Sequence, residues 1–204
     1  TIDPPPDLYR YEVADRGVDK LGDLEERHIQ FFHEQGYLVV QQAFEPAVIK
    51  AANQAITYLI DNRWENTEGL VQFEGSADEV QNLTPRKRRL AVRKLMSFGI
   101  WDDRLKTTTE HPGIVAALRR LLGEAPVLFQ EMALLKPPHI GREKPWHQDC
   151  AYFNMPLGSL VIGVWIALDE ATAENGCLHI IPGSHKKGPT LHFNRRDWQI
   201  CDTD

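Results

Sequence analysis

The amino-acid sequence predicts a mainly β protein in which helices come first and a β-rich core follows. Residues 45–62 carry apolar side chains at helical spacing, so the N-terminal part is expected to be helical. Later the pattern changes to short apolar runs that turn-forming residues separate, and these runs lie at 126–138, 145–153, 159–168 and 177–183. This succession of short strands and turns is typical of an antiparallel sandwich or jelly roll.

The first expected elements follow a Pro-rich, charged arm. Residues 22–36 predict a short helix that ends at Gly36, because glycine accepts the left-handed conformation common at a helix C-terminus. The run "YLVVQQAF" at 37–44 is rich in β-forming residues. The helix at 45–62 has Pro46 in its first turn, where a missing backbone N–H costs nothing.

A polar stretch separates this helix from the next one. Residues 63–90 are polar and contain glycine and proline, so they predict a loop region. The basic run "RKRR" at 86–89 could hold an anionic substrate or could belong to a solvated loop. Residues 111–123 predict a helix that ends at Gly123.

Length and composition indicate one globular domain over residues 1–204, with a helical part at 1–123 and a jelly-roll part at 124–204. The chain is 42% hydrophobic and 25% charged, and its formal net charge of -6 argues against a nucleic-acid partner. No long apolar run predicts a membrane span, and the N-terminal residues do not resemble a signal peptide. Three cysteines without a C-x-x-C pair fit a reducing compartment, so we expect a cytoplasmic protein.

The candidate site is the sequence "WHQDC", in which His147 and Asp149 are two residues apart. In a strand, residues i and i+2 project to the same face, so the imidazole and the carboxylate would point together. Such a pair with one further histidine makes the facial triad that binds non-haem Fe(II) and leaves coordination positions open. The spacing alone is weak evidence, because two polar residues on one face of a sheet would have it too.

The surrounding sequence is more specific. The segments "EMALLKPP", "WHQDCAYF" and "GVWIALDEATAENGCLHIIPGSH" occur in this order between Glu131 and His185. Together they resemble the phytanoyl-CoA dioxygenase family, and "FFHEQGYLVVQQAF" resembles the N-terminal entry of that family. The resemblance implies a double-stranded β-helix (jelly-roll) core and an oxygenase that depends on Fe(II), 2-oxoglutarate and O₂.

The resemblance also assigns roles to single residues. His147 and Asp149 match two of the metal ligands of the family. Trp165 and Met132 match residues that line the 2-oxoglutarate pocket, although both could simply pack in a core. Lys94, in "VRKLMSF", resembles a lysine that meets a carboxylate of 2-oxoglutarate, although it could be a surface lysine.

The sequence departs from the family pattern after "PGSH". The resemblance implies a distal histidine on a later strand and an arginine beyond it, and neither segment is found before Asp204. We therefore expect the chain to lack the C-terminal strands of the jelly roll and to show no turnover by itself. Three other histidines are weaker alternatives for the third ligand: His179, His185, which Arg195 and Arg196 follow, and His192.

The sequence thus predicts an Fe(II)- and 2-oxoglutarate-dependent dioxygenase that hydroxylates a small organic substrate, with release of succinate and CO₂. The "RKRR" run leaves an anionic substrate as one alternative beside a solvated loop, and the oligomeric state is open. Two other classes remain. One is an inactive jelly-roll binding module or pseudoenzyme without the distal histidine. The other is a cupin-like metal hydrolase or isomerase that uses the same pair without 2-oxoglutarate.

Overall fold

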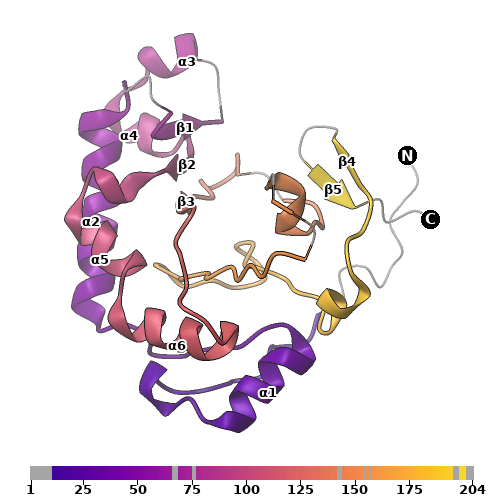
Figure 1. The fold of residues 1–204 in the computed structure, drawn as a ribbon. Coiled ribbons are helices and arrows are strands. Elements are labelled where there is room, and N and C mark those ends of the chain that lie inside the picture. The colour runs from indigo at the N-terminus through magenta and orange to yellow at the C-terminus, as the bar shows by residue number, and fades with distance from the viewer. Residues whose placement is uncertain are drawn as a thin grey trace. The chain divides into compact units, whose positions relative to one another are not determined.

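The computed structural model describes residues 11–65, 69–74, 77–141, 144–153, 155–156, 158–194 and 198–200 (Figure 1). The chain forms two compact units. The first comprises residues 1–41, 143–164 and 178–204, and the second comprises residues 42–142 and 165–177.

Helix α2, Pro46–Arg63, is the centre of the second unit. Pro46 lies in its first turn, as the sequence predicts. The buried residues of α2 recur every three to four positions and make one apolar face, which consists of Ala52, Ala55, Ile56, Leu59 and Ile60. This face supplies about half of the hydrophobic core of the unit.

A three-stranded antiparallel sheet contributes much of the rest of this core. Its order is β1 (Val71–Phe73), β2 (Val92–Met96) and β3 (Met132–Leu134). Leu95 lies opposite Val71 on one side and Ala133 on the other, so these three side chains share the face that joins the core.

Short helices complete the second unit. They are α3 (Ala77–Gln81), α4 (Pro85–Arg89), η2 (Phe98–Ile100), α5 (Asp103–Thr109) and α6 (Pro112–Leu122). Gly123 ends α6 with a φ of 77°, as the sequence predicts. The prediction of a loop over residues 63–90 is wrong, because β1, α3 and α4 lie within it. In α4 the Thr84 hydroxyl accepts a hydrogen bond from the Lys87 N–H, which stabilises the first turn.

The first unit contains η1 (Leu21–Asp23), α1 (Glu26–Gln35), η3 (Asp149–Tyr152), η4 (Ser184–Lys187) and the hairpin strands β4 (His192–Asn194) and β5 (Trp198–Ile200). Gly36 ends α1 with a φ of 82°, which confirms the predicted stop. The run 37–44 forms no strand. It contributes one bridge, between Val18 and Val40.

The prediction of a mainly β jelly roll is wrong for this structure. Strands make up only about 10% of it and helices 39%. Of the run 126–138 only β3 is paired, and the run 145–153 ends in η3. The runs 159–168 and 177–183 contain no strand among the described residues. Apolar composition does not make a strand unless a neighbouring strand accepts its backbone hydrogen bonds.

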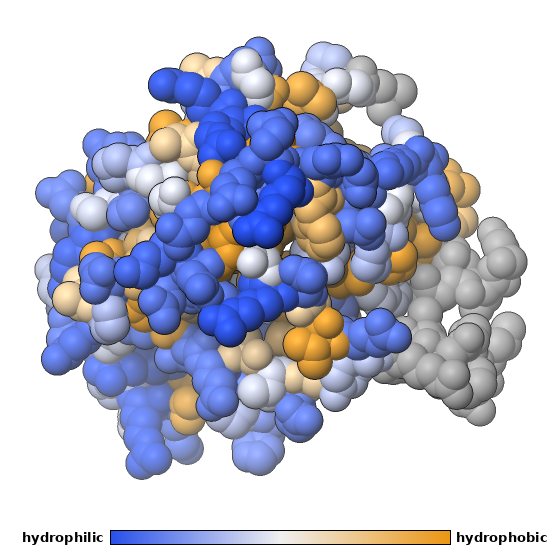
Figure 2. Space-filling view, turned by 90° about the horizontal axis from the view of Figure 1, so that it is seen from below, coloured by the Kyte–Doolittle hydropathy of each residue, from blue (hydrophilic) through white to orange (hydrophobic). Residues whose placement is uncertain are grey.

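The unpaired runs leave apolar side chains in contact with solvent. Exposed ones include Leu160, Val161, Val164, Leu178, Ile180 and Ile181. Hydrophilic residues dominate the face in Figure 2, and hydrophobic residues are exposed in several places between them. Among the described residues, no helix has both the length and the apolar character that crossing a membrane requires.

The N-cap of α5 gives a testable stability prediction. Asp102 Oδ1 accepts hydrogen bonds from the Arg104 backbone N–H and from Nε, each at 2.9 Å, and Oδ2 accepts one from Nη2 at 2.6 Å. The Asp102 side chain is only 9% exposed. We expect Asp102→Ala to lower the free energy of unfolding by about 1–2 kcal/mol at pH 7 in urea denaturation. Asp103→Ala, in the exposed next position, is the control and should cost less.

The stability lost in Asp102→Ala should depend on pH. The hydrogen bonds from Arg104 hold the pKa of Asp102 below its usual range. A carboxyl whose folded pKa is lowered stabilises the fold fully above its unfolded pKa of about 3.9 and loses this contribution as the pH falls through the folded pKa. The difference between wild type and Asp102→Ala should therefore be constant from about pH 5 to 8 and shrink below about pH 4. A difference that persists undiminished in strong acid would contradict an ionic origin.

Candidate metal centre and co-substrate residues

His147 and Asp149 lie together in the first unit. The imidazole Nε2 is 3.2 Å from the carboxylate Oδ1, and their side chains are 22% and 65% exposed. Asp149 begins the 3-10 turn η3 rather than continuing a strand. Gln148, between the two, has extended backbone angles of φ -104° and ψ 132°, and this one residue suffices to place both side chains on the same side.

A backbone contact fixes the orientation of the imidazole. His147 Nδ1 is 2.7 Å from the carbonyl oxygen of Pro145, and only an Nδ1–H can donate to it. In the neutral ring Nε2 therefore carries a lone pair, which faces a carboxylate oxygen. Two acceptors this close need a proton or a cation between them. The hydrogen bond with Asp149 accordingly raises the pKa of His147, against the effect of burial, and lowers the pKa of Asp149.

The two donor atoms fit a metal ion of the first transition row. Two ligands at right angles, each about 2.1 Å from a metal, are about 3.0 Å apart. The Nε2 to Oδ1 separation of 3.2 Å is close to this value. An imidazole and a carboxylate are also the donor types of the iron facial triad. Among the described residues, no group of three His, Cys, Asp or Glu residues could hold a metal.

Three neighbours of the pair were not predicted as site residues. The Tyr152 ring stands edge-on to the His147 ring, with 5.4 Å between centroids. The Lys144 ammonium donates to the Tyr152 hydroxyl at 3.2 Å, and its charge lowers the pKa of both His147 and Asp149 slightly. Gly163 approaches from the "GVWIAL" segment, and a Cβ there would be 3.6 Å from Asp149 Oδ2.

The other histidines of interest have partners of their own. His192 Nε2 accepts a hydrogen bond from the Gln148 backbone N–H at 2.7 Å, and its Nδ1 donates to the Thr190 carbonyl. His185 Nε2 donates to the His33 carbonyl at 3.0 Å, near the end of α1. His179 makes edge contacts with the Tyr11 and Trp146 rings (centroids 5.6 and 6.4 Å apart). Arg195 and Arg196 lie outside the described residues.

The predicted 2-oxoglutarate residues lie in the second unit. Lys94 is opposite Leu134, and Met132 is opposite Met96, so Lys94 and Met132 share the sheet face that points away from the core. Met132 is 38% exposed and Trp165 is 51% exposed. Neither side chain is therefore a buried core residue, which was the alternative interpretation of both.

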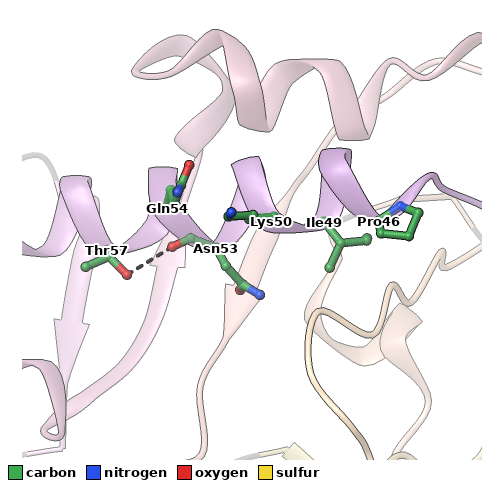
Figure 3. A pocket seen from close by; sticks show the side chains of 6 residues that line it. All are labelled: Pro46, Ile49, Lys50, Asn53, Gln54 and Thr57. Atoms are coloured by element: carbon green, nitrogen blue, oxygen red, sulfur yellow. Dashed lines mark hydrogen bonds between the residues drawn. The ribbon is translucent and has the colours of Figure 1, made fainter.

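The second unit also has an open groove of about 600 Å³ along α2. Figure 3 shows the six side chains that line it, which are Pro46, Ile49, Lys50, Asn53, Gln54 and Thr57. None of the predicted site residues is among them, so the groove does not mark the predicted site.

Comparison with known proteins identifies the family. The family model described as phytanoyl-CoA dioxygenase matches residues 32–203. The chain is 28% identical over 202 residues to zebrafish (Danio rerio) phytanoyl-CoA dioxygenase domain-containing protein 1. The aligned part covers 84% of this chain and 69% of that protein. It is 50% identical over 87 residues to the Bos taurus protein of the same name, covering 42% and 30% of the two chains.

A plant relative agrees with these matches. The phytanoyl-CoA dioxygenase of Arabidopsis thaliana is 29% identical over 201 residues, covering 86% of this chain and 70% of the relative. No solved structure matches the chain significantly. The family model spans most of the chain and includes the segments that carry the resemblance. The chain therefore belongs to the phytanoyl-CoA dioxygenase family.

Proposed function

We propose that the protein is an Fe(II)- and 2-oxoglutarate-dependent dioxygenase that hydroxylates a small organic substrate. Family membership supports this reaction class. The observation that carries the proposal is the pair of donor atoms His147 Nε2 and Asp149 Oδ1, which are 3.2 Å apart. The Pro145 carbonyl holds Nδ1–H and thereby presents the Nε2 lone pair to the carboxylate side.

His147 and Asp149 would hold the iron. When bound, iron supplies the activation of O₂ that couples the conversion of 2-oxoglutarate into succinate and CO₂ to hydroxylation of the substrate. Lys94 would pair its ammonium with a carboxylate of 2-oxoglutarate, and Met132, on the same sheet face, would give an apolar wall with Trp165. Because Asp149 would supply a carboxylate ligand to the iron, the pair favours hydroxylation over halogenation.

The basic run contributes less to an anionic substrate site than its composition indicates. Arg89 forms an ion pair with Asp61, and the Arg88 guanidinium lies 3.6 Å from the centroid of the Trp64 ring. Two of the four basic side chains thus stabilise the fold, whereas Arg86 and Lys87 are exposed at α4. The substrate is therefore proposed only as a small organic molecule.

An anaerobic titration separates this proposal from its alternatives. The full-length protein with Fe(II) should gain a visible absorption band when 2-oxoglutarate is added, and it should form succinate once O₂ is admitted. Iron binding without the band would favour a metal hydrolase or isomerase. Absence of iron binding would favour a binding module. The finding that no three-ligand cluster exists among the described residues agrees with that alternative.

Substitution of Lys94 or Trp165 should affect 2-oxoglutarate first. Losing one ammonium–carboxylate contact in a partly buried site costs about 1.5–3 kcal/mol, which is a rise in the KM for 2-oxoglutarate of about 10- to 100-fold. We expect such a rise for Lys94→Met in succinate-release kinetics, and a rise of the same kind for Trp165→Ala. Lys50→Met, at an exposed lysine of α2, should change nothing. If the KM for 2-oxoglutarate is unchanged and the KM for the substrate is altered, Lys94 and Trp165 bind the substrate and not 2-oxoglutarate.

A further inference from the structure

The segment at residues 165–177, called the Trp165 segment below, lacks regular secondary structure. It contains a turn at residues 173–176 but no helix or strand. Two local backbone hydrogen bonds lie within it, from the Gly176 N–H to the Ala173 carbonyl and from the Cys177 N–H to the Thr172 carbonyl. A sheet ladder therefore does not fix the backbone that carries Trp165.

One side chain from α2 binds this segment near its start. Asn53 is partly buried, and its Nδ2 donates to the Leu168 carbonyl at 2.9 Å across 115 positions of sequence. The Leu168 side chain packs against the core at the same place. In Figure 3 the side chains of Asn53 and Gln54 leave α2 in opposite directions, so only Asn53 is suited to this contact. Ala52 and Ala55 are fully buried on either side, which holds the helix in position.

A second side chain binds the segment near its end. Lys136 Nζ donates to the Gly176 carbonyl at 2.7 Å. A Cβ at Gly176 would lie only 2.6 Å from that nitrogen, and the φ of Gly176 is 84°, so the turn and the ammonium fit closely. Lys136 follows β3, the strand that carries Met132. The contact therefore links the Trp165 segment to the stretch of backbone just after Met132, the second predicted pocket residue.

We infer that Asn53 and Lys136 are positioning residues for the 2-oxoglutarate site, because they hold both ends of the segment that presents Trp165. This inference rests on the proposed function. A pocket wall binds its ligand well only if its backbone is already in place, since ordering it on binding costs affinity. The two side-chain donors supply the fixed hydrogen bonds that a strand partner would otherwise give.

The test uses the full-length protein with four variants. Asn53→Ala and Lys136→Met remove the two donors, and Lys136→Arg keeps a cationic donor. Gln54→Ala is the matched control, exposed and adjacent on α2. Hydrogen–deuterium exchange is measured on peptides that cover residues 165–177, and succinate release gives kcat and the KM for 2-oxoglutarate.

We expect faster exchange of the Trp165 segment in Asn53→Ala and Lys136→Met, but not in Gln54→Ala. In Asn53→Ala and in Lys136→Met the KM for 2-oxoglutarate should rise about fivefold, as the loss of one hydrogen bond implies, while kcat stays within about twofold of wild type. In Lys136→Arg the KM should return toward the wild-type value. Unchanged exchange in both variants would overturn the positioning role, and so would faster exchange with an unchanged KM. If the wild-type protein forms no succinate, the proposed function is overturned instead. The exchange measurement does not depend on turnover, so it still tests the positioning role by itself.

Discussion

Replacing His147 or Asp149 with alanine is expected to abolish Fe(II) binding and turnover in the full-length protein. The two donor atoms are 3.2 Å apart, and each variant removes one of them. Loss of a residue that merely orients a metal ligand costs about 10- to 100-fold in affinity or activity, so loss of a ligand itself should exceed about 100-fold. Iron content after dialysis and succinate formation measure the two effects.

A conservative variant separates coordination from folding. In Asp149→Asn the amide can still donate to His147 Nε2, so the local contact of the pair is kept while the anionic ligand is lost. His139→Asn is the control, because His139 is exposed and asparagine accepts its positive φ of 68°. Asp149→Asn should lose iron with an unchanged thermal midpoint, and His139→Asn should keep it. Iron held at wild-type affinity in either alanine variant would refute the assignment.

The pair could be predicted from sequence because its geometry is local. Residues i and i+2 share a side whenever the residue between them is extended, and Gln148 alone meets that condition. Helix ends were predictable for the same reason, since Gly36 and Gly123 adopt the left-handed conformation by themselves. The start of α4 carries a local signal too, a Thr84 cap followed by proline, which the polar composition of the stretch obscured.

The parts that could not be predicted depend on distant contacts. The apolar runs at 159–168 and 177–183 have the composition of strands, but only their neighbours in space decide whether a ladder forms. In the sequence, His185 is only a weak alternative for the third metal ligand. In the structure it bonds to the His33 carbonyl, 152 positions away. The hydrogen bond from Asn53 to the Leu168 carbonyl could not be predicted from the sequence either, because the two residues are 115 positions apart.

Leucine-to-alanine substitutions on the two faces of the sheet should differ strongly in cost. Leu95, in β2, is fully buried among the core residues of α2 and β1, whereas Leu134, in β3, is 56% exposed on the other face. Removing a buried leucine side chain costs about 2–5 kcal/mol, and a surface substitution usually costs less than about 0.5 kcal/mol. Urea denaturation should therefore show a much lower midpoint for Leu95→Ala and a nearly unchanged one for Leu134→Ala, with similar slopes.

The comparison also tests the proposed co-substrate residues, because Leu134 shares its face with Lys94 and Met132. If both variants lose stability equally, the outer face of the sheet is covered in solution, and Lys94 could not receive a carboxylate there without displacing that cover. If only Leu95→Ala is destabilised, the face is open to a ligand. In that case 2-oxoglutarate should raise the unfolding midpoint of Leu134→Ala as much as that of the wild type, since ligand binding to the folded state alone stabilises it.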